Sequence, residues 1–218
     1  MSETVVFIHG IWGNRAAFFP LAHHVKGRGY KTRYFDYNSV AYNPARNAAK
    51  LATYLEKLNA DTIHLVAHSL GGLVLKHYMH YYDHSRIGKV IMVATPLNGS
   101  NVAKLLNKND FTKLLLGRAT ERGLLGDVPP WPKDQPLGMI AGNLDKGFGT
   151  VAERVATELG EPKLFSTASD GTVGLEETMS DEVTHRIEVN QSHTAMLLTK
   201  DVARAVSCYL KQGNFDHL

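Results

Sequence analysis

Cysteine is almost absent from this 218-residue chain, since Cys208 is the only one. A single cysteine excludes an intrachain disulfide framework. Cys208 falls in a helical pattern near the end of the sequence, where we expect it to be a small, buried hydrophobic residue. One free thiol also fits a reducing compartment.

Long hydrophobic runs are missing as well. The longest fall far short of the roughly 20 apolar residues that a membrane-spanning helix needs. The strand-like segment Thr4-Val5-Val6-Phe7-Ile8 follows Met1 closely, and no charged leader or small-residue cleavage site comes before it. We therefore expect a soluble, cytoplasmic protein without stable membrane insertion.

The chain has little excess charge of either sign. Its formal net charge is +3, and Lys and Arg are scattered along the sequence. A nucleic-acid-binding domain is expected to carry a basic patch or stripe, so nucleic acid is not an expected partner. A hydrophobic fraction of 44% with 21% charged residues is typical of a folded globular protein.

What the sequence does contain is a regular alternation of short β-rich runs and amphipathic stretches. This alternation predicts an α/β fold, with βα units around a parallel sheet whose two faces are covered by helices. We expect strands over residues 4–8, 31–37, 62–67, 89–94, 137–141 and 185–189. We expect helices over residues 16–26, 44–58, 70–82 and 193–210.

The alternation breaks between residues 95 and 135. Residues 97–135 carry a helical pattern and end in the loop Pro129-Pro130-Trp131-Pro132. We interpret them as a small helical cap inserted above the sheet of a single α/β domain over residues 1–218.

The segment Leu65-Val66-Ala67-His68-Ser69-Leu70-Gly71-Gly72 places a serine between a buried strand and a helix. A sharp strand-to-helix turn exposes the serine oxygen for nucleophilic attack, and its crowding requires small residues two positions before and after the serine. Ala67 and Gly71 occupy those positions. The alternative is a serine that only caps a helix after a core strand.

Acyl transfer also requires N–H donors that stabilise a developing oxyanion. In this arrangement one donor is the residue after the nucleophile, here Leu70. The other comes from the loop after an early strand, where His9-Gly10 is followed by Ile11, which we expect to be the second donor. Trp12, in the same loop, is a candidate for the wall of the substrate pocket.

A carboxylate and a histidine follow the serine in the chain order that this fold uses, Ser, Asp, His. Asp170 lies in Ser169-Asp170-Gly171-Thr172-Val173, and His193 lies 23 residues later between an expected strand and the last helix. Asp145, after the strand expected at residues 137–141, is a second candidate for the acid. Taken alone, Asp-Gly is also a common turn signal.

These segments resemble bacterial α/β-hydrolase esterases and lipases. The similarity is carried by Ile8-His9-Gly10-Ile11-Trp12, by the serine segment and by Asp170-Gly171-Thr172-Val173 and Ser192-His193. Two further segments, Thr95-Pro96-Leu97-Asn98-Gly99-Ser100 and Glu176-Glu177-Thr178, resemble compact members described as esterases or acetyltransferases. The resemblance implies an α/β-hydrolase fold, a triad of Ser69, Asp170 and His193, and an oxyanion hole formed by Ile11 and Leu70. It favours Asp170 over Asp145.

The resulting hypothesis is a serine carboxylester hydrolase that acts on a small-molecule ester, with no metal and no organic cofactor. We expect short- to medium-chain acyl groups and a cap that stays fixed. An acyltransferase with the same triad, an interfacial lipase and an inactive scaffold that binds a partner or lipid are the alternatives. His77, His80 and His84 have helical spacing, but we expect them on exposed helix surface rather than around a metal.

Overall fold

A computed structural model describes residues 2–146, 154, 156–157 and 163–218. Its centre is a six-stranded, fully parallel sheet with the order β2-β1-β3-β4-β5-β6. The strands are β1 (Glu3–Ile8), β2 (Lys31–Phe35), β3 (Thr62–His68), β4 (Ile87–Val93), β5 (Leu137–Gly142) and β6 (His185–Val189).

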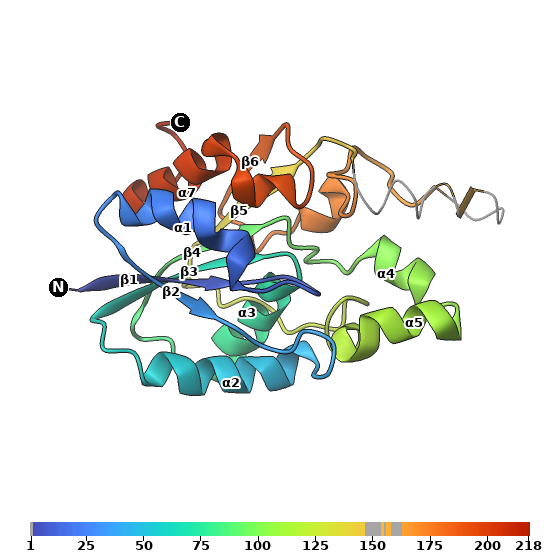
Figure 1. Cartoon of the computed structure of the whole chain (residues 1–218), viewed down its shortest axis with the longest axis horizontal. Helices are drawn as coiled ribbons and strands as arrows, with labels where there is room; N and C mark the ends of the chain where they lie inside the picture. The colour runs from blue at the N-terminus through green and yellow to red at the C-terminus, as the bar shows by residue number, and fades with distance from the viewer. Residues whose placement is uncertain (1, 147–153, 155, 158–162) are drawn as a thin grey trace.

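Helices cover both faces of this sheet (Figure 1). One face carries α1 (Phe19–Lys26) and α7 (Lys200–Gln212), and the other carries α2 (Pro44–Glu56) and α3 (Leu70–Tyr81). Successive side chains of a strand point to opposite faces. In β1, Val5 and Phe7 accordingly pack in the core beside α1 and α7, whereas Val6 and Ile8 pack in the core beside α2 and α3. Burial on both faces explains why the inner strands β1, β3, β4 and β5 are largely apolar, whereas the edge strands β2 and β6 carry charged residues.

The cap predicted over residues 97–135 ends too late, because Trp131 is buried in the core beside α2 and α3 and Gln135 Nε2 donates to Gly88 O at 2.9 Å near the start of β4. The helical part of this segment is the cap, and it extends beyond the carboxyl ends of the strands (Figure 1). It contains α4 (Asn101–Leu106), α5 (Asp110–Leu116) and a 3-10 helix over Gly117–Thr120. Two backbone hydrogen bonds help to fix it. Ser100 N–H donates to Leu124 O at 2.7 Å within the cap, and Arg118 N–H donates to Val40 O at 2.8 Å in the loop after β2.

The segment predicted as one helix over residues 193–210 is interrupted, so that prediction was wrong. A 3-10 turn spans Ala195–Leu198, Thr199 is extended with φ −91° and ψ 148°, and α7 begins only at Lys200. The extended, β-branched residue at the helix start separates the two pieces. His193 therefore lies in a loop, where its N–H donates to Asp170 O at 2.9 Å.

Smaller differences concern helix starts and the cysteine. The helix expected from residue 16 begins as a 3-10 turn over Arg15–Phe18, and the Asn14 side chain caps this turn by accepting the Ala16 N–H. Cys208 is half-buried rather than buried, with its Sγ 3.6 Å from Asn214 O.

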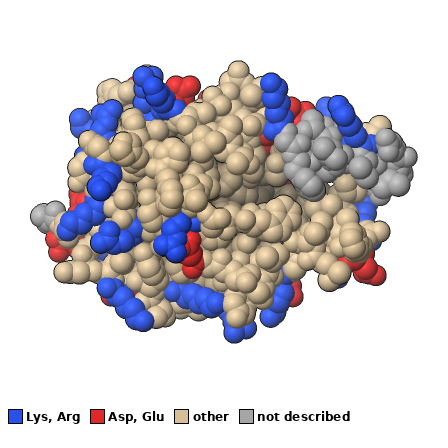
Figure 2. Space-filling model, viewed as in Figure 1, with Lys and Arg blue, Asp and Glu red and all other residues tan. Residues whose placement is uncertain are grey.

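Charged side chains are spread around the margin of the face seen in Figure 2, and the central surface is mainly uncharged. Among the residues that the structure describes, no helix is long and apolar enough to cross a membrane.

Candidate active site

Ser69 occupies a strained turn between β3 and α3. Its φ is 53° and its ψ is −124°, a conformation that a residue with a side chain rarely adopts. The surrounding structure holds it there, because Ser69 N–H donates to Val93 O at 2.9 Å and Thr95 Oγ1 donates to Ser69 O at 3.0 Å. Strain of this kind persists only where neighbouring contacts determine the backbone, and it is common at functional sites.

The turn is crowded by the end of β1. A Cβ atom on Gly71 would lie 2.5 Å from Ile8 O and 2.7 Å from His9 O, so a side chain here would displace backbone atoms. Ala67, on the other side of the serine, is fully buried. This packing explains the small residues that the sequence carries at both positions.

Asp170 and His193 are in direct contact. His193 Nδ1 is 2.7 Å from Asp170 Oδ2, and the other carboxylate oxygen accepts N–H groups from Thr172 at 2.9 Å and Val173 at 2.7 Å. Asp170 is 1% exposed, so these bonds act where solvent screening is weak. With Nδ1 donating to the carboxylate, Nε2 of His193 is left to accept a proton.

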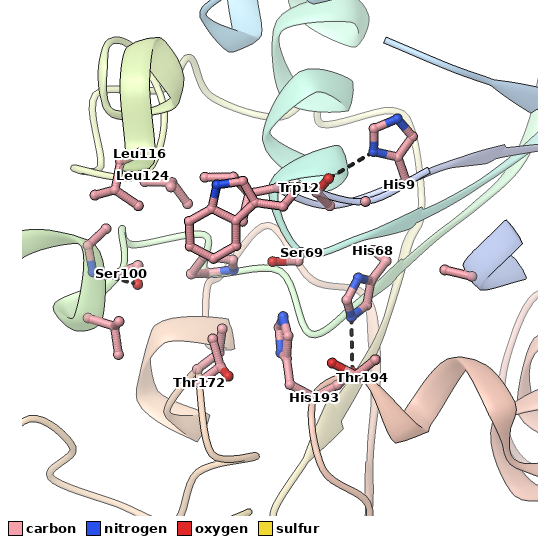
Figure 3. A pocket seen from close by; sticks show the side chains of 18 of the residues that line it. His9, Trp12, His68, Ser69, Ser100, Leu116, Leu124, Thr172, His193 and Thr194 are labelled. Atoms are coloured by element: carbon pink, nitrogen blue, oxygen red, sulfur yellow. Dashed lines mark hydrogen bonds between the residues drawn. The ribbon is translucent and has the colours of Figure 1, made fainter. Parts of the chain in front are cut away.

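The imidazole of His193 points toward the side chain of Ser69 (Figure 3). Both residues line a cavity of about 460 Å³, together with Trp12 and several residues of the cap. The structure thus brings Ser69, Asp170 and His193 to one place, although the roles assigned to them remain predictions.

Asp145 does not contact His193. Its side chain is exposed and accepts a hydrogen bond from Ser169 Oγ at 3.1 Å. Ser169 Oγ in turn accepts the Gly171 N–H at 3.2 Å. Asp145 therefore contacts the turn that carries Asp170.

The candidate oxyanion donors lie at the ends of two elements. Leu70 is the first residue of α3, so its N–H has no carbonyl partner within the helix. In the loop after β1, Trp12 N–H donates to Ser39 Oγ at 3.0 Å and Gly13 N–H donates to Gly10 O at 3.2 Å. Ile11 lines the cavity and remains the candidate donor from this loop.

His9 and Tyr37 support this loop, a role that the sequence motifs did not indicate. His9 Nδ1 donates to Gly10 O at 2.8 Å, and its Nε2 accepts the Tyr37 N–H at 3.4 Å. The Tyr37 hydroxyl donates to His9 O at 2.6 Å, and the two rings stack with centroids 4.3 Å apart. Burial lowers the pKa of His9, in agreement with a neutral ring that donates from one nitrogen and accepts at the other.

His68 supports the candidate base. Its Nε2 donates to the backbone oxygen of His193 at 3.1 Å, and the two imidazole centroids are 4.6 Å apart. Burial, and next the charge of protonated His193, hold the pKa of His68 well below its usual value. A neutral His68 fixes the His193 backbone without adding a second positive charge.

Trp12 lines the cavity and also contacts the cap. Its backbone has a positive φ of 54°, and its indole Nε1 donates to Leu115 O at 2.8 Å. The loop that carries Ile11 is therefore joined to α5.

The three histidines with helical spacing do not share an exposed surface, so that expectation was wrong. His77 is 1% exposed and its Nε2 lies 2.8 Å from Arg122 O, while His84 lies beyond the end of α3. Within the described part of the chain, no group of three or more His, Cys, Asp or Glu residues could hold a metal ion.

Residues 1–147 match the family described as a domain of unknown function, DUF7379. The chain belongs to this family. The match includes Ser69 and the cap but ends before Asp170 and His193. A comparison with curated protein sequences found no match.

Solved structures similar to this DUF7379 chain include the mature lipase BlEst2 of Bacillus licheniformis, with a TM-score of 0.70 and 19% identity over 96% of this chain and 91% of that one. The metagenomic carboxyl esterase MGS0156 is similar with a TM-score of 0.62 and 20% sequence identity, over 89% of this chain and 65% of that one. The pyrethroid hydrolase PytH is similar with a TM-score of 0.60 and 13% sequence identity, over 98% of this chain and 99% of that one. At these identities the likeness shows the fold, which is the α/β-hydrolase fold.

Proposed function

We propose that the protein is a serine carboxylester hydrolase with Ser69 as nucleophile, His193 as base and Asp170 as the acid that orients the base. The observation that carries the proposal is the strained Ser69, faced by a histidine whose other nitrogen is bonded to a buried carboxylate. Nucleophile, base and orienting group in this order form the general arrangement for nucleophilic catalysis.

In the first half-reaction His193 Nε2 takes the proton of Ser69 while Oγ attacks the ester carbonyl. The N–H groups of Ile11 and Leu70 stabilise the oxyanion that develops. His193 then gives the proton to the leaving alcohol, and an acyl-enzyme forms. Water enters, His193 takes its proton, and the same steps release the acid and restore Ser69.

The environment of Asp170 suits its proposed part. Its Oδ1 accepts two backbone N–H groups, which hold the carboxylate in position, and its Oδ2 faces His193 Nδ1, where it would stabilise the imidazolium that forms during each half-reaction. The reaction as proposed uses only these side chains, two backbone amides and water, and it requires no metal or organic cofactor.

The direct test is Ser69→Ala, measured by fluorophosphonate labelling and by turnover of a p-nitrophenyl ester. We expect labelling to disappear and kcat to fall by up to about a millionfold, because removal of the nucleophile eliminates covalent catalysis.

Ser100→Ala is the matched control. Ser100 also lines the cavity, but its hydroxyl accepts the Ala103 N–H at 3.2 Å as a helix cap. Labelling should persist in this variant. Labelling of Ser69→Ala at another serine would contradict the proposal.

An acyltransferase would share the first half-reaction and differ in the acceptor. Product analysis with an added acceptor alcohol separates the two: free acid as the main product supports hydrolysis, and a new ester supports transfer.

A further inference from the structure

The proposed mechanism determines which way an ester substrate would lie in the cavity. His193 must reach the oxygen of the leaving alcohol to protonate it, so the alcohol lies on the His193 side of Ser69. The acyl chain must then extend away from His193. Figure 3 shows Leu116 and Leu124 on the side of Ser69 away from His193, beyond the Trp12 ring.

The part of the cavity on that side, here named the cap arm, is apolar. It is lined by Leu116 and Leu124 and by Ala103 and Leu106 of α4, which pack in the same cluster as these two leucines. The hydroxyl of Ser100, which also lines the cavity, is occupied as the cap of α4. Leu116 and Ala103 are 3% and 2% exposed and pack in one cluster with Leu70, the residue after the nucleophile.

The cavity is also without fixed charge. Among the described residues that line it, there is no Lys, Arg, Asp or Glu. Burial lowers the pKa of both His9 and His68, so these two lining histidines stay neutral near pH 7. A charged acyl group would therefore lose its hydration without gaining a partner, which is strongly unfavourable.

We propose that the cap arm is the acyl-binding site, that it selects neutral aliphatic acyl groups, and that Ala103 and Leu116 set the chain length it accepts. This inference rests on the proposed ester hydrolysis, because it uses the direction of proton transfer from His193.

The test is a series of p-nitrophenyl esters from acetate to dodecanoate. In Ala103→Leu the larger side chain fills the cap arm, and we expect kcat/KM for octanoate to fall at least about 10-fold, since one methylene of pocket space is worth roughly 10- to 200-fold. The acetate ester has no chain that would have to enter the cap arm, so its kcat/KM should change less than about twofold.

Leu116→Ala should have the opposite effect and move the preferred ester to a longer chain. Leu115→Ala is its matched control, because Leu115 is the neighbouring residue but is 47% exposed and is not among the residues that line the cavity. The control should keep the wild-type profile. If Leu116→Ala does not fold, as judged by circular dichroism, Ala103→Leu carries the test alone.

Charge selection is tested with the wild-type protein. The p-nitrophenyl monoester of succinic acid, which is anionic, should show kcat/KM at least about 100-fold below the neutral pentanoate ester of similar length. Comparable rates for the two would overturn the assignment of a neutral acyl site.

Two kinds of failure remain distinguishable. An unchanged chain-length profile in Ala103→Leu, with Ser69 still labelled by fluorophosphonate and esters still hydrolysed, would overturn the acyl-site inference alone. A wild-type protein that neither hydrolyses esters nor labels at Ser69 would overturn the proposed function itself.

Discussion

The serine turn and the cap differ in how they are held. Ser69 is 6% exposed, its strained backbone is fixed by bonds from Thr95 and to Val93, and Gly71 lies against the end of β1. The cap is built from shorter elements and exposes large apolar side chains. Its helix α5 has seven residues, and Phe111 and Leu114 on it are each 76% exposed.

This difference separates two tasks. A strained conformation requires a rigid surrounding, which the sheet provides through buried strands on both sides. A pocket wall only needs shape and polarity, which a short insertion can provide and which can vary without disturbing the turn. We therefore expect changes near Ser69 to alter turnover of every ester, and changes in the cap to alter the choice among esters.

After Ser69→Ala, the largest effect is expected for Asp170→Asn. Loss of the carboxylate removes the group that fixes the His193 tautomer and stabilises its charge, and kcat should fall by about 10⁴-fold. Asp145→Asn changes an exposed carboxylate that accepts a hydrogen bond from Ser169 Oγ and does not contact His193. This substitution should lower kcat by no more than about threefold. Steady-state rates on one soluble ester decide this, and equal losses would mean that the acid has been misassigned.

The junction between the two regions should respond to pH through Glu177. This buried glutamate accepts the N–H of Asn101, at the start of α4, and the N–H of Gly174, next to the Asp170 turn, at 2.8 Å. Burial raises the pKa of Glu177 to about 7 from an ordinary value of 4.5. The folded protein thus binds the proton more tightly than the unfolded chain, so the free energy of unfolding should fall by about 3 kcal/mol as pH rises from 4.5 to above 7.

Urea unfolding at several pH values measures this change. Glu177→Gln should lack the decline that the ionisation of Glu177 causes. Glu176→Gln should retain it, because the Glu176 carboxylate contacts Ser166 and Thr167 instead of α4. Identical pH profiles for the wild type and Glu177→Gln would show that Glu177 titrates normally.

Gly71→Ala tests how tightly the turn is held. The added methyl group would displace backbone atoms of Ile8 or His9, and a displacement of about 1 Å at a catalytic group costs roughly 100-fold in rate. The loss in kcat should be similar for acetate and octanoate esters, as expected for a change in the rigid region. A loss confined to long esters would contradict the division between the two regions.

The smallest effect is expected for Phe111→Ser combined with Leu114→Ser. Both side chains face solvent and neither lines the cavity, so kcat/KM on soluble esters should stay within about twofold. With the cap tied at Val40, Glu177 and Trp12, we also expect no sharp rise in rate as tributyrin passes its solubility limit. A sharp rise in the wild type that the double variant loses would make the cap a mobile lid.

Much of the fold could be predicted because its local signals agree with one another. Each of the six strands begins and ends within two residues of its predicted bounds. A short apolar run between two helical patterns is typical of a buried strand of a parallel sheet. The start of α2 was also clear, because Asn43 accepts the Arg46 N–H at 2.9 Å and Pro44 occupies the first turn.

The misplaced features depend on contacts between distant segments. The break at Thr199 leaves His193 free to bond Asp170, and no local pattern encodes that pairing. The burial of His77 depends on the Arg122 carbonyl, 45 residues away. The support that His9 receives from Tyr37, and His193 from His68, likewise appears only when the strands are placed side by side.

The bond from the Trp12 indole to the Leu115 carbonyl joins the two regions through one side chain. Trp12 directly follows Ile11, whose N–H would face the oxyanion. The bond to Leu115 therefore connects this part of the loop to the last turn of α5. A substrate that pushes the cap outward would pull on this part of the loop during the chemical step. If the proposed chemistry holds, an acyl chain that fits the cap badly should therefore lower turnover as well as binding, because its strain would reach the loop beside Ser69.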